Sequence, residues 1–421
     1  MKKMKKLVSV VMSVAMVYSL TGCSSGGKES AAPESKPAET QTPASGESSD
    51  AALAELASSN PIKIGFFSPL TSASASADGE STLNAAKLAV ADINAAGGLL
   101  GRSVELVDYD DALDTNQAVS IAEKLTTKDG VVAIVSGSYS GPTRVAAPII
   151  QAAGIPMVSA YAVHPDVVNA GDYIFSQSFP GQVQGKAGAV LAVDKLGAKR
   201  ISIIAVDLDY GSELAGTFEE YAKAHGAEIV SYDKVAMSDN EFTSIITKLK
   251  QDVKPDLIYM ANYYAHASEV MKQCKTLGLD VPVVGTEGVD SWQFLETAGK
   301  NADGLYLTTN MDRDTKDENT QKFMKDYRAT YNKEPDMVGA SAYDAFQVIF
   351  KAIEEAGSTE PAAIKDKIAS LKDIDTVTGK LLYYTENGEA VKPVQIQVIK
   401  DGKYHYYDII DDPEIIVPET K

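Results

Sequence analysis

The strongest constraint on the fold is an alternation of strand and helix patterns that starts at Pro61. A first series opens with the apolar segment IKIGFFSP (62–69), continues with an amphipathic helix pattern over 83–98 and reaches IPMVSAYA (155–162). Its strands are apolar along their whole length, which is typical of parallel sheets covered by helices on both faces. The sequence therefore predicts an α/β fold built on doubly wound parallel sheets.

A second series of the same kind begins near Phe179 and runs from RISIIAVD (200–207) to VPVVGTEG (281–288). The roughly 360 residues that carry these patterns are too many for one such core, so we expect two lobes. The last third contains a helix pattern over 339–357 and two strand pairs, turning at Asn387-Gly388 and Asp401-Gly402. Pattern alone does not assign these pieces to either lobe.

The N-terminus is predicted to lie outside the fold. Lysines at positions 2–6 precede an apolar run over 7–20 that is too short to span a bilayer, and Leu20-Thr21-Gly22-Cys23 follows. This segment resembles a bacterial lipobox, which implies a signal peptide over 1–22 and a lipid on Cys23. A plain secretory signal with an incidental cysteine is the alternative. Residues 23–60, rich in Ser, Ala, Pro, Glu and Gly, are predicted to be a disordered tether. We therefore expect an extracytoplasmic protein that is attached to the cell membrane only by its lipid anchor.

Composition argues against several classes of function. A net charge of −19 disfavours nucleic acid or an anionic membrane surface as a partner. With Cys23 acylated, Cys274 is left alone and is interpreted as a small packed thiol. The four histidines have no metal-ligand spacing, and we find no nucleophile elbow, Cys/His pair or dinucleotide fingerprint. We expect no metal, no cofactor and no enzymatic activity.

The segment IVSGSYSGPT (134–143) places small hydroxyl residues and glycines directly after a buried strand. It is not a nucleophile elbow, because Tyr139 puts the serines out of register, and Pro142-Thr143 replaces the Lys-Ser/Thr ending of a phosphate loop. Hydroxyl and N–H groups beside the start of a helix attract negative charge, so we interpret the segment as a cradle for another anion. Thr143 is interpreted as a cap of the following helix.

Polar and aromatic residues gather where the predicted strands end. In open parallel sheets, ligands bind beyond the carboxyl ends of the strands. Such ends are followed by a Ser/Ala/Thr-rich loop over 68–78, by 136–143, by 161–164, by 209–211, and by Tyr263 and Glu287. If the two lobes face each other, these ends line one cleft.

The motifs AVADINAAGGLLGRSVELVDYDDALDTNQAV (89–119), GIPMVSAYA (154–162), DYG (209–211) and GTEGV (285–289) occur together in this order. With this spacing the chain resembles the Leu/Ile/Val-binding proteins, solute-binding components of ABC transporters, from about Ile62 to Ile410. The resemblance implies a type I periplasmic-binding-protein fold whose lobes are joined by a three-strand hinge, with crossovers near 178–180, 304–306 and 392–394. The first lobe would then comprise 61–178 and 306–392. The second would comprise 179–305 and 393–421, the latter including a strand pair and a C-terminal tail.

The resemblance also implies roles for individual residues. Ser140 matches the serine that holds an amino-acid carboxylate, and Glu287 matches the acid that pairs with the ammonium. Tyr210 and Tyr263 match rings that close over the ligand, with Tyr264 as the alternative to Tyr263.

Four positions depart from the family pattern or leave two interpretations open. Tyr161 and Val163 match positions that offer backbone groups to the ligand, but they replace the usual small and hydroxyl residues. Asp78 falls where the family often has an aromatic contact, so it either assists the ammonium or lies in solvent. Trp292 either edges the cleft or packs in the interior.

We therefore expect an extracytoplasmic substrate-binding lipoprotein of an ABC transporter, acting as a monomer. It would capture an amino acid, branched-chain or otherwise aliphatic, by hinge closure and deliver it to the permease subunits. The alternative is a ligand-sensing protein that presents an amino acid, an amide or a small carboxylic acid to a receptor.

Overall fold

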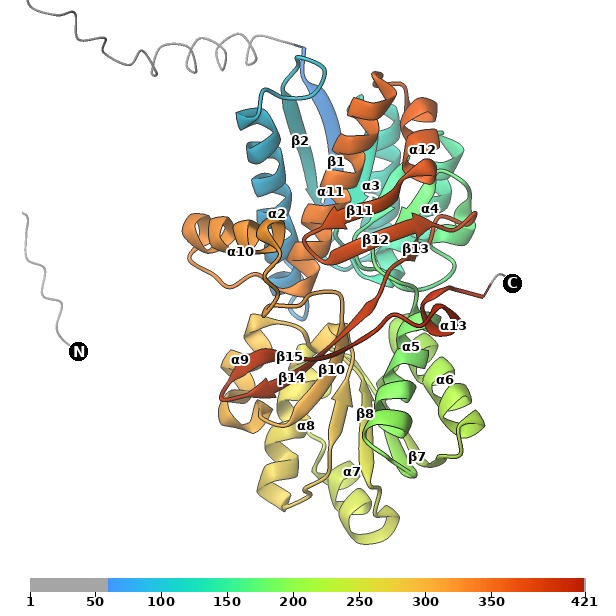
Figure 1. Ribbon diagram of the computed structural model, residues 1–421, viewed down its shortest axis with the longest axis vertical. Helices are drawn as coiled ribbons and strands as arrows, with labels where there is room; N and C mark the ends of the chain where they lie inside the picture. Colours follow the sequence, from blue (N-terminus) through green and yellow to red (C-terminus); the bar gives the residue numbers. More distant parts are fainter. Residues whose placement is uncertain (1–59, 420–421) are drawn as a thin grey trace, which may run out of the picture. The chain divides into compact units, whose positions relative to one another are not determined.

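The computed structural model describes residues 60–419 (Figure 1). The predicted signal peptide, Cys23 and all but the last residue of the predicted tether lie outside the described residues. Within the described part of the chain, no helix combines the length and the hydropathy that crossing a bilayer requires.

The first lobe is built on a five-stranded, wholly parallel sheet in the order β2-β1-β3-β4-β5. Adjacent residues of β1 point to opposite faces of this sheet, so Phe66 packs in the cluster with α2 and α11, and Phe67 packs in the cluster with α3 and α4. The elements are β1 (Ile62–Ser68), α2 (Ser76–Ala95), β2 (Val104–Asp110), α3 (Thr115–Thr127), β3 (Ala133–Ser136), α4 (Ser140–Ala152), β4 (Met157–Ser159) and β5 (Ile174–Ser176).

Part of the first lobe comes from later in the chain. Helices α10 (Glu318–Tyr331), α11 (Met337–Ala356) and α12 (Pro361–Ser370) return to it, and α11 packs along α2. A small antiparallel sheet of β11 (Lys372–Thr376), β12 (Gly379–Tyr384) and β13 (Ala390–Val391) completes the lobe (Figure 1). The predicted Asn387-Gly388 turn joins β12 to β13, and Gly388 has the positive φ that such a turn requires.

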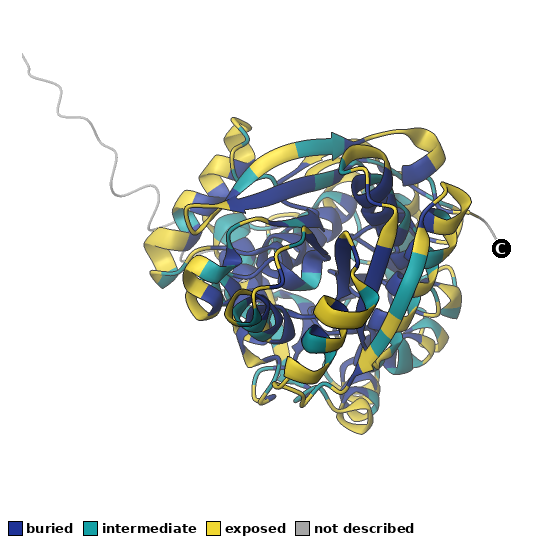
Figure 2. Cartoon of the chain, turned by 90° about the horizontal axis from the view of Figure 1, so that it is seen from below, coloured by how far each residue is buried: buried dark blue, intermediate teal, exposed yellow. Residues whose placement is uncertain are grey.

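The second lobe is built on a seven-stranded sheet in the order β15-β14-β10-β9-β8-β6-β7. Its first five strands along the chain are parallel, whereas β14 and β15 join as an antiparallel pair through the predicted Asp401-Gly402 turn. Strand β14 is mostly buried and the edge strand β15 is more exposed (Figure 2). The strands are β6 (Arg200–Val206), β7 (Glu228–Val235), β8 (Leu257–Ala261), β9 (Val283–Gly285), β10 (Leu305–Thr309), β14 (Val394–Lys400) and β15 (Lys403–Ile410).

Helices cover both faces of the second sheet. Helices α5 and α6 pack together on one face, and α7, α8 and α9 form the layer on the other. The helices are α5 (Gly181–Ala189), α6 (Asp209–Ala224), α7 (Thr243–Lys248), α8 (Tyr264–Leu277), α9 (Trp292–Ala298) and α13 (Pro413–Ile416). The predicted class, two α/β lobes with doubly wound parallel sheets, is confirmed.

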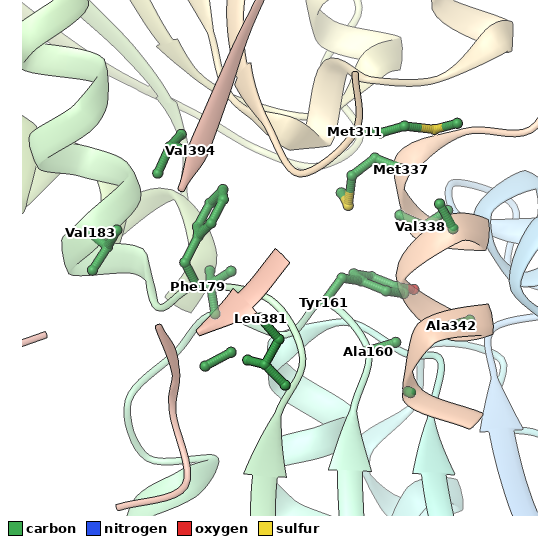
Figure 3. Packing of buried hydrophobic residues seen from close by; sticks show 14 of the residues in the cluster. Ala160, Tyr161, Phe179, Val183, Met311, Met337, Val338, Ala342, Leu381 and Val394 are labelled. Carbon is green, nitrogen blue, oxygen red and sulfur yellow. The ribbon is translucent and has the colours of Figure 1, made fainter. Parts of the chain in front are cut away.

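The chain crosses between the lobes three times. The crossings lie between β5 and α5, between β10 and α10, and between β13 and β14. The second crossing comes later than the resemblance implied, because β10 pairs with β9 and β14 and so keeps the chain in the second sheet through Thr309. Buried apolar side chains from these segments, among them Phe179, Met311 and Val394, pack where the lobes meet (Figure 3).

Two helices of the first lobe begin earlier than the sequence pattern indicated. Helix α2 starts at Ser76, so Asp78 lies in its first turn and not in a loop. Helix α4 starts at Ser140, which puts this serine at the helix N-terminus. The predicted capping role of Thr143 is wrong, because its hydroxyl bonds to the Ser136 hydroxyl at 2.7 Å and to the Ser138 carbonyl oxygen at 3.3 Å.

Candidate functional site

A small cavity lies between the two lobes, beyond the carboxyl ends of strands from both sheets. We call it the inner cavity; its volume is about 20 Å³, enough for a water molecule. The first lobe contributes the N-termini of α2, α4 and α11, and the second lobe contributes the segments that follow β6, β8 and β9. The inner cavity is lined by Asp78, Tyr139, Ser140, Tyr161, Tyr210, Tyr263, Glu287, Gly288, Met337 and Val338.

All but one of the predicted ligand-binding residues line the inner cavity. The exception is Val163, which lies behind Ser140 and donates its backbone N–H to the Ser140 hydroxyl oxygen at 3.3 Å. Tyr263 lines the cavity, and its neighbour Tyr264 is not part of the lining. Because Asp78 is buried, the interpretation that it lies in solvent is wrong.

Ser140 is held at the start of α4 by an extended backbone at Tyr139. The first N–H groups of a helix have no partner within the helix, and the helix dipole adds partial positive charge at this end. The Ser140 hydroxyl still has a proton to donate, because its contact with Val163 uses it as an acceptor. This end of the inner cavity therefore suits a carboxylate.

Stacked tyrosine rings connect the lobes. Tyr139 of the first lobe stacks on Tyr263 of the second with centroids 4.5 Å apart, and Tyr263 stacks on Tyr210 at 4.7 Å. Tyr161 meets Tyr139 edge to face at 6.0 Å. Figure 3 shows Tyr161 reaching from the end of β4 toward α11, near Met337 and Val338. The sequence analysis missed Tyr139 as a site residue, although it stands inside the 134–143 segment.

The tyrosine hydroxyls make hydrogen bonds within the protein. Tyr139 donates to Asp78 Oδ2 at 2.7 Å, and Tyr161 donates to the Gly137 carbonyl oxygen at 2.8 Å. The Tyr210 hydroxyl bonds to the Thr286 hydroxyl at 2.7 Å and accepts the Gly288 N–H at 3.2 Å. These bonds fix the rings, so the rings offer the cavity mainly their apolar surfaces.

Glu287 contributes a carboxyl group to the inner cavity from the second lobe. It opens a short 3₁₀ helix, Glu287–Val289, directly after β9, and its backbone N–H donates to Gln184 Oε1 at 3.1 Å. Its side chain is buried, and Oε2 has no hydrogen-bond partner among residues 60–419. Burial raises the pKa of Glu287 to about 8, although hydrogen bonding by its own backbone and by the Tyr210 side chain opposes the shift; Asp290 adds a smaller upward contribution. A cation in the cavity would lower this pKa again.

Asp78 brings a second carboxyl group from the first lobe. Burial, together with repulsion by Asp336, raises the pKa of Asp78 to about 7, although the Tyr139 hydrogen bond opposes the shift. Asp336 caps α11 by accepting the Gly339 N–H at 3.0 Å, and burial raises its pKa to about 6. Asp336 and the cavity residues Met337 and Val338 were not predicted, because their stretch of sequence carries no strand-end signal.

A larger hollow of about 540 Å³ lies on the other side of the stacked rings and shares Tyr139, Ser140, Tyr210 and Tyr263 with the inner cavity. Arg144 of α4 and Asp209 of α6 line this hollow and form an ion pair at 2.9 Å between the lobes. Elsewhere between the lobes, Lys333 Nζ lies 5.2 Å from the centroid of the half-buried Trp292 ring. Trp292 therefore contacts a residue of the opposite lobe.

Cys274 lies outside the cleft, in the core of the second lobe. Cys274 is buried, and burial raises the pKa of its thiol to about 12, as suits a packed thiol. Among residues 60–419, no group of three His, Cys, Asp or Glu side chains is placed to hold a metal ion.

Two α/β lobes, three crossings and a site between facing strand ends define a bilobed binding protein with the type I periplasmic-binding-protein fold. A sequence profile described as "Periplasmic binding protein" matches residues 61–403. The Leu/Ile/Val-binding protein of Escherichia coli K12 is 30% identical over 72% of this chain and 82% of its own length. The chain belongs to this family, whose members are the substrate-binding proteins of transporters.

Solved structures support the same assignment. The branched-chain amino acid transporter substrate-binding protein LivJ from Streptococcus pneumoniae, in complex with isoleucine, is 30% identical and has a TM-score of 0.78, covering 83% of this chain and 99% of LivJ. An ABC transporter substrate-binding protein from Desulfitobacterium hafniense, in complex with Leu, is 26% identical with a TM-score of 0.71, covering 83% of this chain and all of that one.

Proposed function

We propose that this protein is the extracytoplasmic substrate-binding lipoprotein of an ABC transporter and that it captures an α-amino acid between its lobes. The observation that carries the proposal is the opposition of two complementary ends in one cavity. Ser140 and the α4 N-terminus face the cavity from the first lobe, and the Glu287 carboxyl group, whose Oε2 has no hydrogen-bond partner in the described part of the chain, faces it from the second. An α-amino acid carries a carboxylate for one end and an ammonium for the other.

Capture would follow from lobe closure. A ligand that binds both lobes stabilises the closed state more than the open one, because neither lobe alone holds both charges. The permease would recognise the closed form and receive the ligand from it. Isoleucine and leucine in the similar structures support an amino-acid ligand, and by likeness alone they favour an aliphatic side chain.

Mass spectrometry of the molecule that co-purifies, released by mild denaturation, tests this proposal. We expect an α-amino acid, and calorimetry with the ligand-free protein should then show reversible binding of that compound without turnover. A tightly bound compound that lacks an ammonium group would contradict the proposal. Delivery requires a separate measurement, namely uptake by vesicles that contain the cognate permease, with and without the binding protein.

A further inference from the structure

The inner cavity holds one more carboxyl group than a neutral amino acid can balance. Glu287 and Asp78 both line it, from opposite lobes, and its described lining contains no Lys, Arg or His. In a neutral amino acid, the single ammonium group would pair with Glu287. The carboxylate of the ligand cancels the charge of that ammonium, so the ligand has no net positive charge left for Asp78. Asp78 would then stay buried without a counter-charge, and an uncompensated buried carboxylate is costly.

The tyrosine rings make the same cavity favourable for a cation. The rings of Tyr139, Tyr161, Tyr210 and Tyr263 line a space that two acids also line, and Tyr139 and Tyr210 each have one face outside the stack on Tyr263. An aromatic face carries negative potential and attracts ammonium groups, the more so when water is excluded. The hydroxyls of Tyr139, Tyr161 and Tyr210 are engaged with Asp78, Gly137 and Thr286, and these bonds orient the three rings.

The surroundings of Asp78 add negative charge and no free cation. Asp336 lies close enough to repel Asp78, and its Oδ2 has no hydrogen-bond partner in the described part of the chain. Arg313, whose charge acts on Asp336, is held in an ion pair by the buried Asp290. Since no Lys, Arg or His of the described lining offsets Asp78, an amine of the ligand is the group that would keep it ionised.

We propose that the ligand is an α-amino acid whose side chain carries a second amine, and that Asp78 selects it. The side-chain ammonium would lie against Asp78 and the tyrosine faces, while Ser140 and Glu287 hold the amino-acid end. This inference rests on the proposed function and narrows its ligand class. It departs from the aliphatic ligand that likeness favours, because a carboxyl group stands where the family resemblance leads us to expect an aromatic contact.

Matched ligand pairs test the inference. L-ornithine and L-norvaline, or L-lysine and L-norleucine, have side chains of the same carbon count and differ by the terminal amine. Calorimetry with the ligand-free full-length protein should show tighter binding of at least one amine-bearing member, by about tenfold or more over its partner. Asp78→Asn, which keeps an acceptor for Tyr139, should abolish this preference. Asp108→Asn, an exposed residue of β2 with the same change in charge, should leave it intact.

The outcomes separate the inference from the function on which it rests. If L-norvaline and L-norleucine bind the wild-type protein as tightly as their partners, the inference is wrong and amino-acid capture stands. If no α-amino acid binds, the proposed function itself fails. If a folded Asp78→Asn protein still prefers the amine-bearing ligand, Asp78 does not select the ligand. Should that variant fail to fold by circular dichroism, the wild-type ranking still decides whether the ligand class is right.

Discussion

The ring of Tyr139 in the first lobe stacks on the ring of Tyr263 in the second, at 4.5 Å and with 13° between their planes. The two residues precede helices of different lobes, α4 and α8, so this contact exists only when the lobes are closed. It fills the space between the lobes and leaves an inner cavity of about 20 Å³, too small for an amino-acid side chain. A ligand in this cavity would therefore have to displace one of these rings or hold the lobes further apart.

Removing the stack should open the ligand-free protein. Aromatic pairs contribute about 0.5–1.5 kcal/mol beyond area burial, so Tyr139→Ala should shift the equilibrium toward the open form. Small-angle scattering would record this shift as a larger radius of gyration. The matched control is Tyr221→Ala, because Tyr221 stacks on His225 within the second lobe alone. Equal radii for Tyr139→Ala and wild type would mean that the ring contact does not hold the lobes together.

Glu287→Gln should weaken amino-acid binding more than Ser140→Ala. The first change leaves a buried ammonium without its counter-charge, which costs about 3–5 kcal/mol, or roughly two to three and a half powers of ten in affinity. The second removes one hydroxyl and leaves the helix N–H groups, at about 1.5–3 kcal/mol. Calorimetry with the identified ligand measures both. Wild-type affinity in Glu287→Gln would show that no ammonium binds there.

The stability of the ligand-free protein should fall as pH rises from about 4.5 to about 8, the interval between the ordinary pKa of Glu287 and its raised value. In this interval the folded protein keeps a proton on Glu287 that the unfolded chain releases, so each increase in pH favours unfolding. Asp78, with its pKa raised to about 7, acts in the same direction.

Urea unfolding across this pH range measures the effect. Glu287→Gln should flatten the dependence, because one unit of pKa difference between the folded and unfolded chain corresponds to about 1.4 kcal/mol. Asp108→Asn serves as the control and should keep the wild-type slope. If the unfolding free energy of Glu287→Gln changes with pH as steeply as that of the wild type, a group other than Glu287 binds the proton.

Two substitutions of Tyr161 should separate the contribution of its hydroxyl to stability from the contribution of its ring to ligand selectivity. Tyr161→Phe keeps the ring but removes the hydrogen bond to the buried Gly137 carbonyl oxygen, which retains a longer contact with the Thr82 hydroxyl at 3.4 Å. It should therefore cost about 0.5–1.5 kcal/mol of stability with little change in ligand ranking. Tyr161→Ala also removes the ring from the cavity wall and should shift preference toward bulkier side chains. Affinities across an amino-acid panel test this. An identical ranking for wild type and Tyr161→Ala would rule out a part for the ring in selectivity.

Anchoring should depend on Cys23 alone. Cys23→Ala removes the acylation site, so the variant should appear in the soluble extracytoplasmic fraction with unchanged ligand affinity. Fractionation followed by calorimetry checks both expectations. Cys274→Ala is the matched control, because this buried thiol packs inside the second lobe and has no part in anchoring. A Cys23→Ala protein that stays with the membrane must have another attachment.

The sequence determined the elements that depend on local pattern. Strands β1, β6 and β8 are buried apolar runs, and α3 begins after a local cap, with Asp114 accepting hydrogen bonds from the N–H groups of Asn116 and Gln117. Residues at strand ends could be chosen as site residues because the carboxyl ends of parallel strands share one edge of the sheet. The strand ends alone indicated the segments 136–143 and 209–211 together with Tyr263 and Glu287, and the family resemblance singled out Ser140 and Tyr210 within them; these four residues line one cavity.

The tertiary structure decided what depends on the meeting of distant segments. Asp78 sits in the first turn of a helix that begins before its apolar pattern does, because the early residues of α2 pack against both α11 and the 134–143 segment. Met337 and Val338 enter the cavity only because α11 returns along α2. Tyr139 is a site residue because its ring stacks on Tyr263 across the closed cleft. Local periodicity contains no information about such contacts, since each arises from the placement of one lobe or helix against another.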